Sequence, residues 1–255
     1  MKSLSSSIKE IIRDAKKGKM FILVDNKDRE NEGDLVVPAS KINPKKINFM
    51  AKHGRGLICL ALTQKKIRKL KLPLMSSVNK SRTQTAFTVS IESKKGISTG
   101  ISAYDRAKTI KVAIKPSSSK KDIVSPGHVF PLVAKNGGVL ERAGHTEASV
   151  DISKLAKLNA SAVICEVMNE DGTMARYKDL IPFAKKHRLK IAKIEDLISH
   201  RLKNERLIKC ISNKKIKIKK YGNFDLKTFR NNLDGSEHYA ITKGKFTMSK
   251  ASRVR

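Results

Sequence analysis

Short apolar segments alternate with amphipathic segments over the first 200 residues, and this alternation limits the possible folds more than any other feature. The runs 21–24, 57–62 and 162–168 are apolar and of strand length, whereas 7–17 and 177–187 have the spacing of amphipathic helices. Because the alternation is not strict enough for a purely parallel sheet, it predicts an α/β (α+β) fold, a three-layer α/β/α sandwich around a mixed β-sheet.

Local signals place most of the other elements. Ser7 and Glu10 fit a capping box at the start of the first helix, and Asn43–Pro44 marks the start of another that ends near Gly54. The pattern predicts further strands at 35–37, 86–91, 129–133 and 191–193, further helices at 63–70, 102–111, 146–158 and 195–203, and a polar loop at 25–34.

The composition changes near His200. From residue 207 isoleucine and lysine alternate, which is typical of an edge strand. We therefore predict one domain over 1–203 and a basic, short, β-rich C-terminal appendage over 204–255.

The formal net charge of +32 raises the question of a nucleic-acid or membrane partner. Lysine is spread along the whole chain and far outnumbers arginine, the residue that reads base edges. We interpret the charge as a lysine-rich surface that attracts phosphorylated substrates and binds nucleic acid only non-specifically.

The cysteines and the apolar runs bear on the compartment. Cys59, Cys165 and Cys210 are widely separated and form no CxxC pair, which suits reduced thiols. No run is long enough for a signal peptide or a membrane span, so we expect a cytoplasmic protein with no membrane partner.

The stretch DRENEGDL, residues 28–35, concentrates carboxylates in a very basic chain. If it is extended, Glu30, Glu32 and Asp34 point to one side and raise one another's pKa. A divalent metal such as Mg²⁺, a cationic substrate or basic side chains would offset this repulsion. The alternative for this loop is a solvated polar turn.

Two further segments carry candidate groups. LERAGHTEAS, residues 140–149, places Arg142, Gly144, His145 and Thr146 at a predicted helix N-terminus, where free amides, an arginine and a hydroxyl would bind phosphate. Two alternatives to a phosphate site remain: His145 ligates a metal, or the segment is only a helix cap with an exposed histidine. His128 lies in a Pro-Gly turn before a strand, a position that suits either proton transfer or a structural role.

Glu166 is a carboxylate in an otherwise apolar strand, VICEVM. Burial would perturb its pKa and make it a candidate acid or base, unless it faces solvent at the strand end. Cys59 lies within a strand in the same way, and its spacing alone indicates only packing.

Together these segments resemble 3,4-dihydroxy-2-butanone 4-phosphate synthases, enzymes of riboflavin biosynthesis, in order and spacing over residues 5–200. The matching motifs are DRENEGDL at 28, HGRGLICL at 53, TAFTVSIE at 85, ISTGISAYDR at 97, PGHVFPL at 126, GGVLERAGHTEA at 137 and ICEVMNEDGTMAR at 164. The resemblance implies a lyase that converts ribulose 5-phosphate to 3,4-dihydroxy-2-butanone 4-phosphate and formate. It also implies Mg²⁺ or Mn²⁺, two ions per active site, and a homodimer with sites near the subunit interface.

The resemblance also assigns residues by position. Glu30 and His145 match the metal ligands, and His128 and Glu166 match the residues essential for catalysis. Glu32 and Cys59 match active-site positions whose roles are open. The positions that match substrate contacts are Arg29, Glu30, Asp34, Thr99, Arg142, Ala143, Gly144, His145, Thr146 and Glu166.

The tail from Lys219 resembles the opening strands of GTP cyclohydrolase II, which follows the synthase in bifunctional proteins. That enzyme builds a zinc site from cysteines, and no cysteine follows Cys210. We therefore expect a remnant or truncation without zinc and without cyclohydrolase activity. A primarily nucleic-acid-binding protein and a catalytically dead homologue are the alternatives to the synthase reading.

Overall fold

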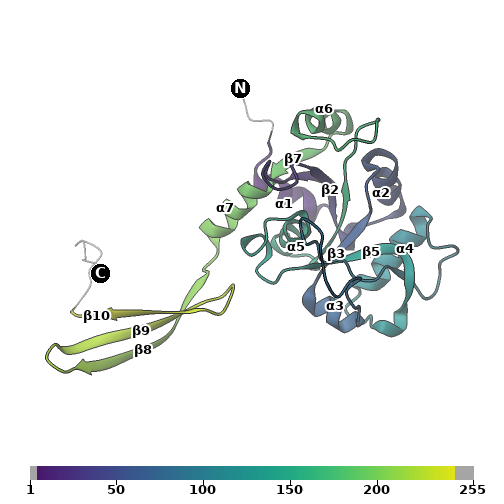
Figure 1. Cartoon of the computed structure of the whole chain (residues 1–255). Helices are drawn as coiled ribbons and strands as arrows, with labels where there is room; N and C mark the ends of the chain where they lie inside the picture. Colours follow the sequence, from purple (N-terminus) through teal and green to yellow (C-terminus); the bar gives the residue numbers. More distant parts are fainter. Residues whose placement is uncertain (1–4, 245–255) are drawn as a thin grey trace. The chain divides into compact units, whose positions relative to one another are not determined.

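The computed structural model describes residues 5–244 of the chain (Figure 1). The chain divides into two compact units, Met1–Arg201 and Leu202–Arg255.

A seven-stranded sheet with the order β4-β5-β3-β6-β2-β1-β7 forms the centre of the first unit. β1 pairs in parallel with β7 and β3 with β5, whereas the other neighbours are antiparallel, so the predicted mixed sheet is confirmed. The strands are β1 (Phe21–Val24), β2 (Gly33–Pro38), β3 (Cys59–Thr63), β4 (Ile91–Ser93), β5 (Ile123–Ala134), β6 (Ser161–Glu166) and β7 (Lys190–Lys193).

Helices cover both faces of this sheet, as the three-layer prediction requires (Figure 1). One apolar cluster joins the sheet to α2, α3, α4 and α6, and a second joins it to α1, α5 and α7. Adjacent residues of β1 alternate between the two clusters, with Ile22 in the first and Phe21 in the second. The helices are α1 (Ile8–Lys16), α2 (Pro44–Phe49), α3 (Gln64–Leu70), α4 (Ala103–Ile114), α5 (His145–Leu155), α6 (Tyr177–His187) and α7 (Ile194–Asn204).

The structure corrects three predicted strands. β2 begins at Gly33, so Asp34 lies in a strand rather than in the loop. The segment 86–91 is not a continuous strand, because it forms only isolated bridges, such as Phe87 with Leu132, before β4 begins. β5 begins at Ile123 instead of residue 129, so His128 lies inside a strand and not in a turn before one.

The second unit contains a three-stranded antiparallel sheet with the order β10-β9-β8. Its strands are β8 (Ile208–Ile218), β9 (Gly222–Asn231) and β10 (Glu237–Thr242). β8 is an edge strand, as its Ile-Lys alternation predicts, but of this separate sheet. Among residues 202–244 every side chain is at least partly exposed. None of the helices within residues 5–244 is long and apolar enough to cross a membrane.

Candidate active site

The acidic loop is a folded turn organised by Asp25, the residue that follows β1. Its carboxylate accepts hydrogen bonds from the backbone amides of Glu30 (3.2 Å) and Glu32 (2.9 Å) and from Nη1 of Arg29 (2.8 Å). Asn31 adopts a left-handed conformation with φ of 56°. The segment is therefore a loop, as predicted, and not an extended strand before Gly33, but Glu30, Glu32 and Asp34 still line one pocket.

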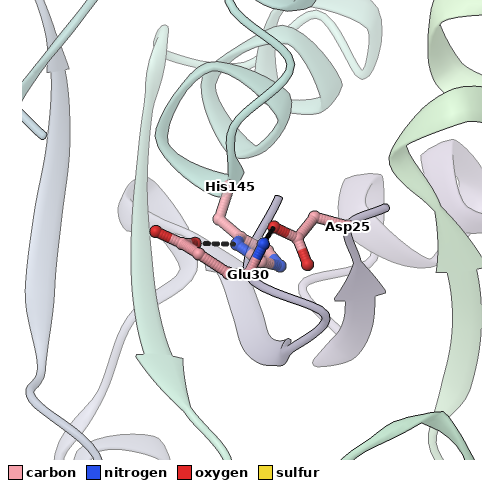
Figure 2. Close-up of side chains that lie close together, drawn as sticks. All are labelled: Asp25, Glu30 and His145. Atoms are coloured by element: carbon pink, nitrogen blue, oxygen red, sulfur yellow. Dashed lines mark hydrogen bonds and ion pairs between the residues drawn. The ribbon is translucent and has the colours of Figure 1, made fainter. Parts of the chain in front are cut away.

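His145 is the first residue of α5 and points into this carboxylate group (Figure 2). Its Nδ1 atom lies 3.8 Å from Oε2 of Glu30 and 3.8 Å from Oδ1 of Asp34. Its Nε2 atom is buried, and no hydrogen-bond partner for it is found among residues 5–244. A buried nitrogen without a partner is costly, so its position calls for a ligand.

Glu30, Asp34 and His145 shift one another's pKa. Hydrogen bonding to His145 lowers the pKa of Glu30 to about 2, despite its burial. Burial opposes the protonation of His145, but Asp34 and Glu30 outweigh it and raise the pKa of the imidazole. Asp34 and Glu30 thus favour the protonated imidazole, and a metal ion that binds His145 would have to displace its proton.

Asp34 and Glu166 lie opposite each other on the neighbouring strands β2 and β6, and both line the pocket. Burial raises the pKa of Asp34, and Glu166 and Glu30 raise it further against the attraction of His145. The backbone amide of Leu57 donates a hydrogen bond of 2.8 Å to Oε2 of Glu166, which fixes the position of that carboxylate. The cavity has a volume of about 230 Å³ and is lined by Arg29, Glu30, Glu32, Asp34, Cys59, Ser81, Thr83, Thr85, Phe87, Leu132, His145, Thr146, Ile164 and Glu166.

Cys59 lines this pocket with a neutral thiol. Its side chain is buried, and burial raises its pKa well above the ordinary value, with Glu166 and Asp34 adding to the shift. A protonated thiol is a poor nucleophile, which favours the packing interpretation of this residue.

Arg142 is held by protein groups just outside this pocket. Its Nη1 pairs with Oε2 of Glu147 (2.7 Å), and its Nη2 donates to the carbonyl of Thr83 (2.9 Å) and to Oγ1 of Thr85 (3.0 Å). It lines a neighbouring cavity of about 670 Å³. The amide of Gly144 donates to the carbonyl of Arg142 (2.8 Å), so it is not the free amide that the helix N-terminus predicts. Ala143 and Gly144 do not line the acidic pocket.

His128 and Thr99 also do not line the acidic pocket. Nδ1 of His128 is hydrogen-bonded to Oε1 of Glu92. Thr99 is exposed, and the residues on either side of it, Ser98 and Gly100, donate to Oδ2 of Asp105 at 2.8–3.2 Å. The predicted site residues thus lie in three places: the acidic pocket, the neighbouring cavity that Arg142 lines, and the segments that carry His128 and Thr99.

Sequence reasoning overlooked Asp25 and Glu92. Asp25 ends an apolar strand directly before the acidic loop, and Glu92 is a charged residue after the apolar run of TVSIE. In both cases a single carboxylate at a strand end is the available signal, and it is too common to single out a site.

Comparison with known proteins places the chain in a family. The family model described as 3,4-dihydroxy-2-butanone 4-phosphate synthase matches residues 9–200. The chain belongs to the 3,4-dihydroxy-2-butanone 4-phosphate synthase family. The predicted resemblance is thereby confirmed.

Members of the synthase family resemble the chain at high identity. A 3,4-dihydroxy-2-butanone 4-phosphate synthase of Photobacterium phosphoreum is 49% identical over 250 residues, which cover 98% of this chain and 69% of the relative. The riboflavin biosynthesis protein RibBA of Aquifex aeolicus is 52% identical over 98% of this chain and 62% of its own length. The chain therefore spans about two thirds of the length of these relatives.

Solved structures of the synthase family share the fold. RibBX, a two-domain synthase from A. baumannii, has a TM-score of 0.84 and 47% identity over 94% of this chain and 70% of that one. A synthase in complex with two magnesium ions has a TM-score of 0.75 and 36% identity, over 78% of this chain and 98% of its own.

Proposed function

We propose that the chain is a lyase that converts D-ribulose 5-phosphate to L-3,4-dihydroxy-2-butanone 4-phosphate and formate in riboflavin biosynthesis. The observation that carries this proposal is the pocket in which Glu30, Asp34, His145 and Glu166 converge. These residues come from three separate motifs of the family, and the fold assembles them at one cavity.

Glu30 and His145 are proposed to hold Mg²⁺ or Mn²⁺, with two ions per active site; a relative is known in complex with two magnesium ions, which supports the use of Mg²⁺. One ligand atom each of Asp25, Glu30 and His145 lies within 4.8 Å of the others, and Nε2 of His145 has no hydrogen-bond partner in the part of the chain that the structure describes. Carboxylate oxygens suit Mg²⁺, which keeps several waters and needs few protein ligands. When bound, a divalent ion stabilises negative charge that develops on substrate oxygens.

The pocket's other groups would bind substrate and move protons. Asp34, Thr146 and Arg29 line the cavity and would contact the sugar phosphate. Glu166, fixed by the amide of Leu57, would take part in proton transfer. The remaining proposed substrate contacts are Thr99, Arg142, Ala143 and Gly144; Glu32 and Cys59 line the pocket without an assigned step.

Proton removal next to the ketone starts the reaction and gives an enediolate. Loss of a hydroxyl as water, a shift of the carbon skeleton, and addition of water with release of formate then follow, and each needs further proton transfers. His128 is the second proposed proton-transfer group, because its imidazole is 44% exposed and rigidly held by Glu92.

We further propose a cytoplasmic homodimer with the active sites near the subunit interface. The exposed residues His128 and Thr99 would then contact the substrate together with the residues that line the acidic pocket. The synthase domain is assigned to residues 1–203 and the basic appendage to 204–255, with no specific nucleic-acid partner.

Formate release from ribulose 5-phosphate tests the proposed function directly. The wild-type protein should release formate with Mg²⁺ or Mn²⁺ and lose this activity in EDTA. Glu30→Gln should lose it in the presence of metal, whereas Glu195→Gln, which removes an exposed carboxylate paired with Lys193, should keep it. No formate under any metal condition would overturn the proposal.

A further inference from the structure

The segment that carries His128 is a bulge of β5. Ile91 pairs with Val129 and Glu92 pairs with Val124, so the four residues 125–128 have no counterpart on β4. Two hydrogen bonds fix the bulge to Ser90: Oγ of Ser125 donates to its carbonyl (2.7 Å), and the amide of Gly127 donates to its hydroxyl (3.1 Å). Bulges of this kind re-aim a side chain.

The side chain of Glu92 contacts the imidazole of His128, which lies in this bulge. Its Oε1 is hydrogen-bonded to Nδ1 of His128, and its side chain is 16% exposed while that of His128 is 44% exposed. Among residues 5–244 Glu92 forms no salt bridge other than this one. The carboxylate of Glu92 therefore pairs with the imidazole of His128 and with no other charged side chain among these residues.

Two glycines make room for the carboxylate of Glu92. A Cβ atom on Gly100 would lie 1.7 Å from Oε1 of Glu92, and one on Gly127 would lie 2.4 Å from its Cγ. Gly100 also has a φ of +87°, which side-chain-bearing residues rarely adopt. Glu92 is thus enclosed between the loop that carries Thr99 and the bulge that carries His128.

We propose that Glu92 is a positioning residue that fixes the tautomer and orientation of His128. A carboxylate beside Nδ1 accepts a hydrogen bond from Nδ1–H of the neutral ring, which leaves the lone pair on Nε2 as the proton acceptor. The same carboxylate stabilises the imidazolium after Nε2 has taken a proton. Glu92 also sets the distance between His128 and the Thr99 loop, because its side chain packs against Gly100.

The kinetic part of this inference rests on the proposed role of His128 in proton transfer. Glu92→Gln keeps the size of the side chain but removes the charge, and its amide can donate as well as accept. We expect kcat for formate release to fall on the order of 10- to 100-fold, within the range for a proton-transfer group, with KM changed less than about twofold. Glu195→Gln removes a carboxylate that is paired with Lys193 and not with His128, and as the control it should keep kcat within about twofold.

The structural part is tested by ¹⁵N NMR of the histidine rings, with the His128 signals assigned from a His128→Gln sample. The wild type should show His128 protonated at Nδ1 and unprotonated at Nε2 when neutral, and Glu92→Gln should show a mixture of tautomers. If Glu92→Gln keeps wild-type kcat, or loses it while the His128 tautomer is unchanged, the proposal is overturned. The NMR result stands even if no formate is released, so failure of the proposed function remains distinguishable.

Discussion

Asp34 and Glu166 are direct partners across the antiparallel pair of β2 and β6, and both side chains line the acidic pocket. Like charges directly opposite one another on a sheet destabilise it. The protein limits this repulsion in two ways: the amide of Leu57 stabilises the Glu166 carboxylate, and His145 lies 3.8 Å from Asp34. The sheet thus presents two coupled carboxylates to whatever binds in the pocket.

The position of Glu166 depends on the glycine that precedes Leu57. A Cβ atom on Gly56 would lie 2.5 Å from the carbonyl oxygen and 2.5 Å from Oε2 of Glu166. The carbonyl belongs to a strand that cannot move freely, so we expect Gly56→Ala to displace the carboxylate. Formate kinetics should show kcat reduced on the order of 10- to 100-fold, the usual effect of losing a supporting contact. Full turnover by Gly56→Ala would contradict this account.

A double variant separates this effect from a general loss of folding. If Gly56→Ala acts only through Glu166, it should add little in a Glu166→Gln background, because effects that share one group are not additive. Additive losses of kcat in the two variants would mean that Gly56 acts elsewhere.

Metal binding should stabilise the folded chain through His145 and Glu30. A ligand at 100 times its Kd stabilises a protein by about 2.7 kcal/mol, and each kcal/mol raises Tm by about 2–4 °C in a protein of this size. We therefore expect saturating MgCl₂ to raise the wild-type Tm by roughly 5–11 °C. Thermal scans of Glu30→Gln and His145→Gln should show little or none of this rise, and Glu195→Gln should show all of it. An equal rise in every variant would place the metal elsewhere.

Elements with local signals were predictable from the sequence alone. The Ser7–Glu10 capping box is present, with Ser7 accepting from the amide of Glu10 at 3.3 Å, and β1 has the predicted bounds. The strand errors come from non-local pairing. Asp34 lies in a strand because it pairs with Glu166, far away in the chain, and neither periodicity nor propensity contains that information.

The site was less accessible than the fold. Periodicity could single out Glu30 and His145 as unusual residues but could not bring them together, because one follows β1 and the other begins α5. Their joint assignment came from the family resemblance. Asp25 and Glu92 could not be predicted as site residues, because their roles depend on the groups that they contact. Only the fold determines these contacts.

The C-terminal unit should be dispensable for the synthase reaction. None of its residues from 202 to 244 is buried, so its sheet contributes little apolar burial of its own. A protein ending at residue 203 should release formate with a kcat and KM within about twofold of the full chain. A large loss of activity, or failure of this protein to fold by circular dichroism, would show that the appendage supports the synthase domain.

A pair of histidines should make the first unit less stable in mild acid. The rings of His53 and His187 lie with centroids 4.7 Å apart, and Phe49 and Phe183 contact the His187 ring. Burial lowers the pKa of both imidazoles, followed by nearby charges, which are Lys52 for His53 and His53 for His187. Below the ordinary value of 6.5 the unfolded chain therefore binds more protons than the folded one, so stability falls as the pH decreases.

His187→Phe removes one of these two titrating groups and keeps an aromatic ring among its neighbours. Urea unfolding at pH 7.5 and at pH 5.5 should show that the variant loses less stability between the two values than the wild type does. The sign follows from the lowered pKa: the neutral imidazole fits the folded site, and protonating it costs folding free energy. An identical loss in both proteins would mean that other groups control the acid response.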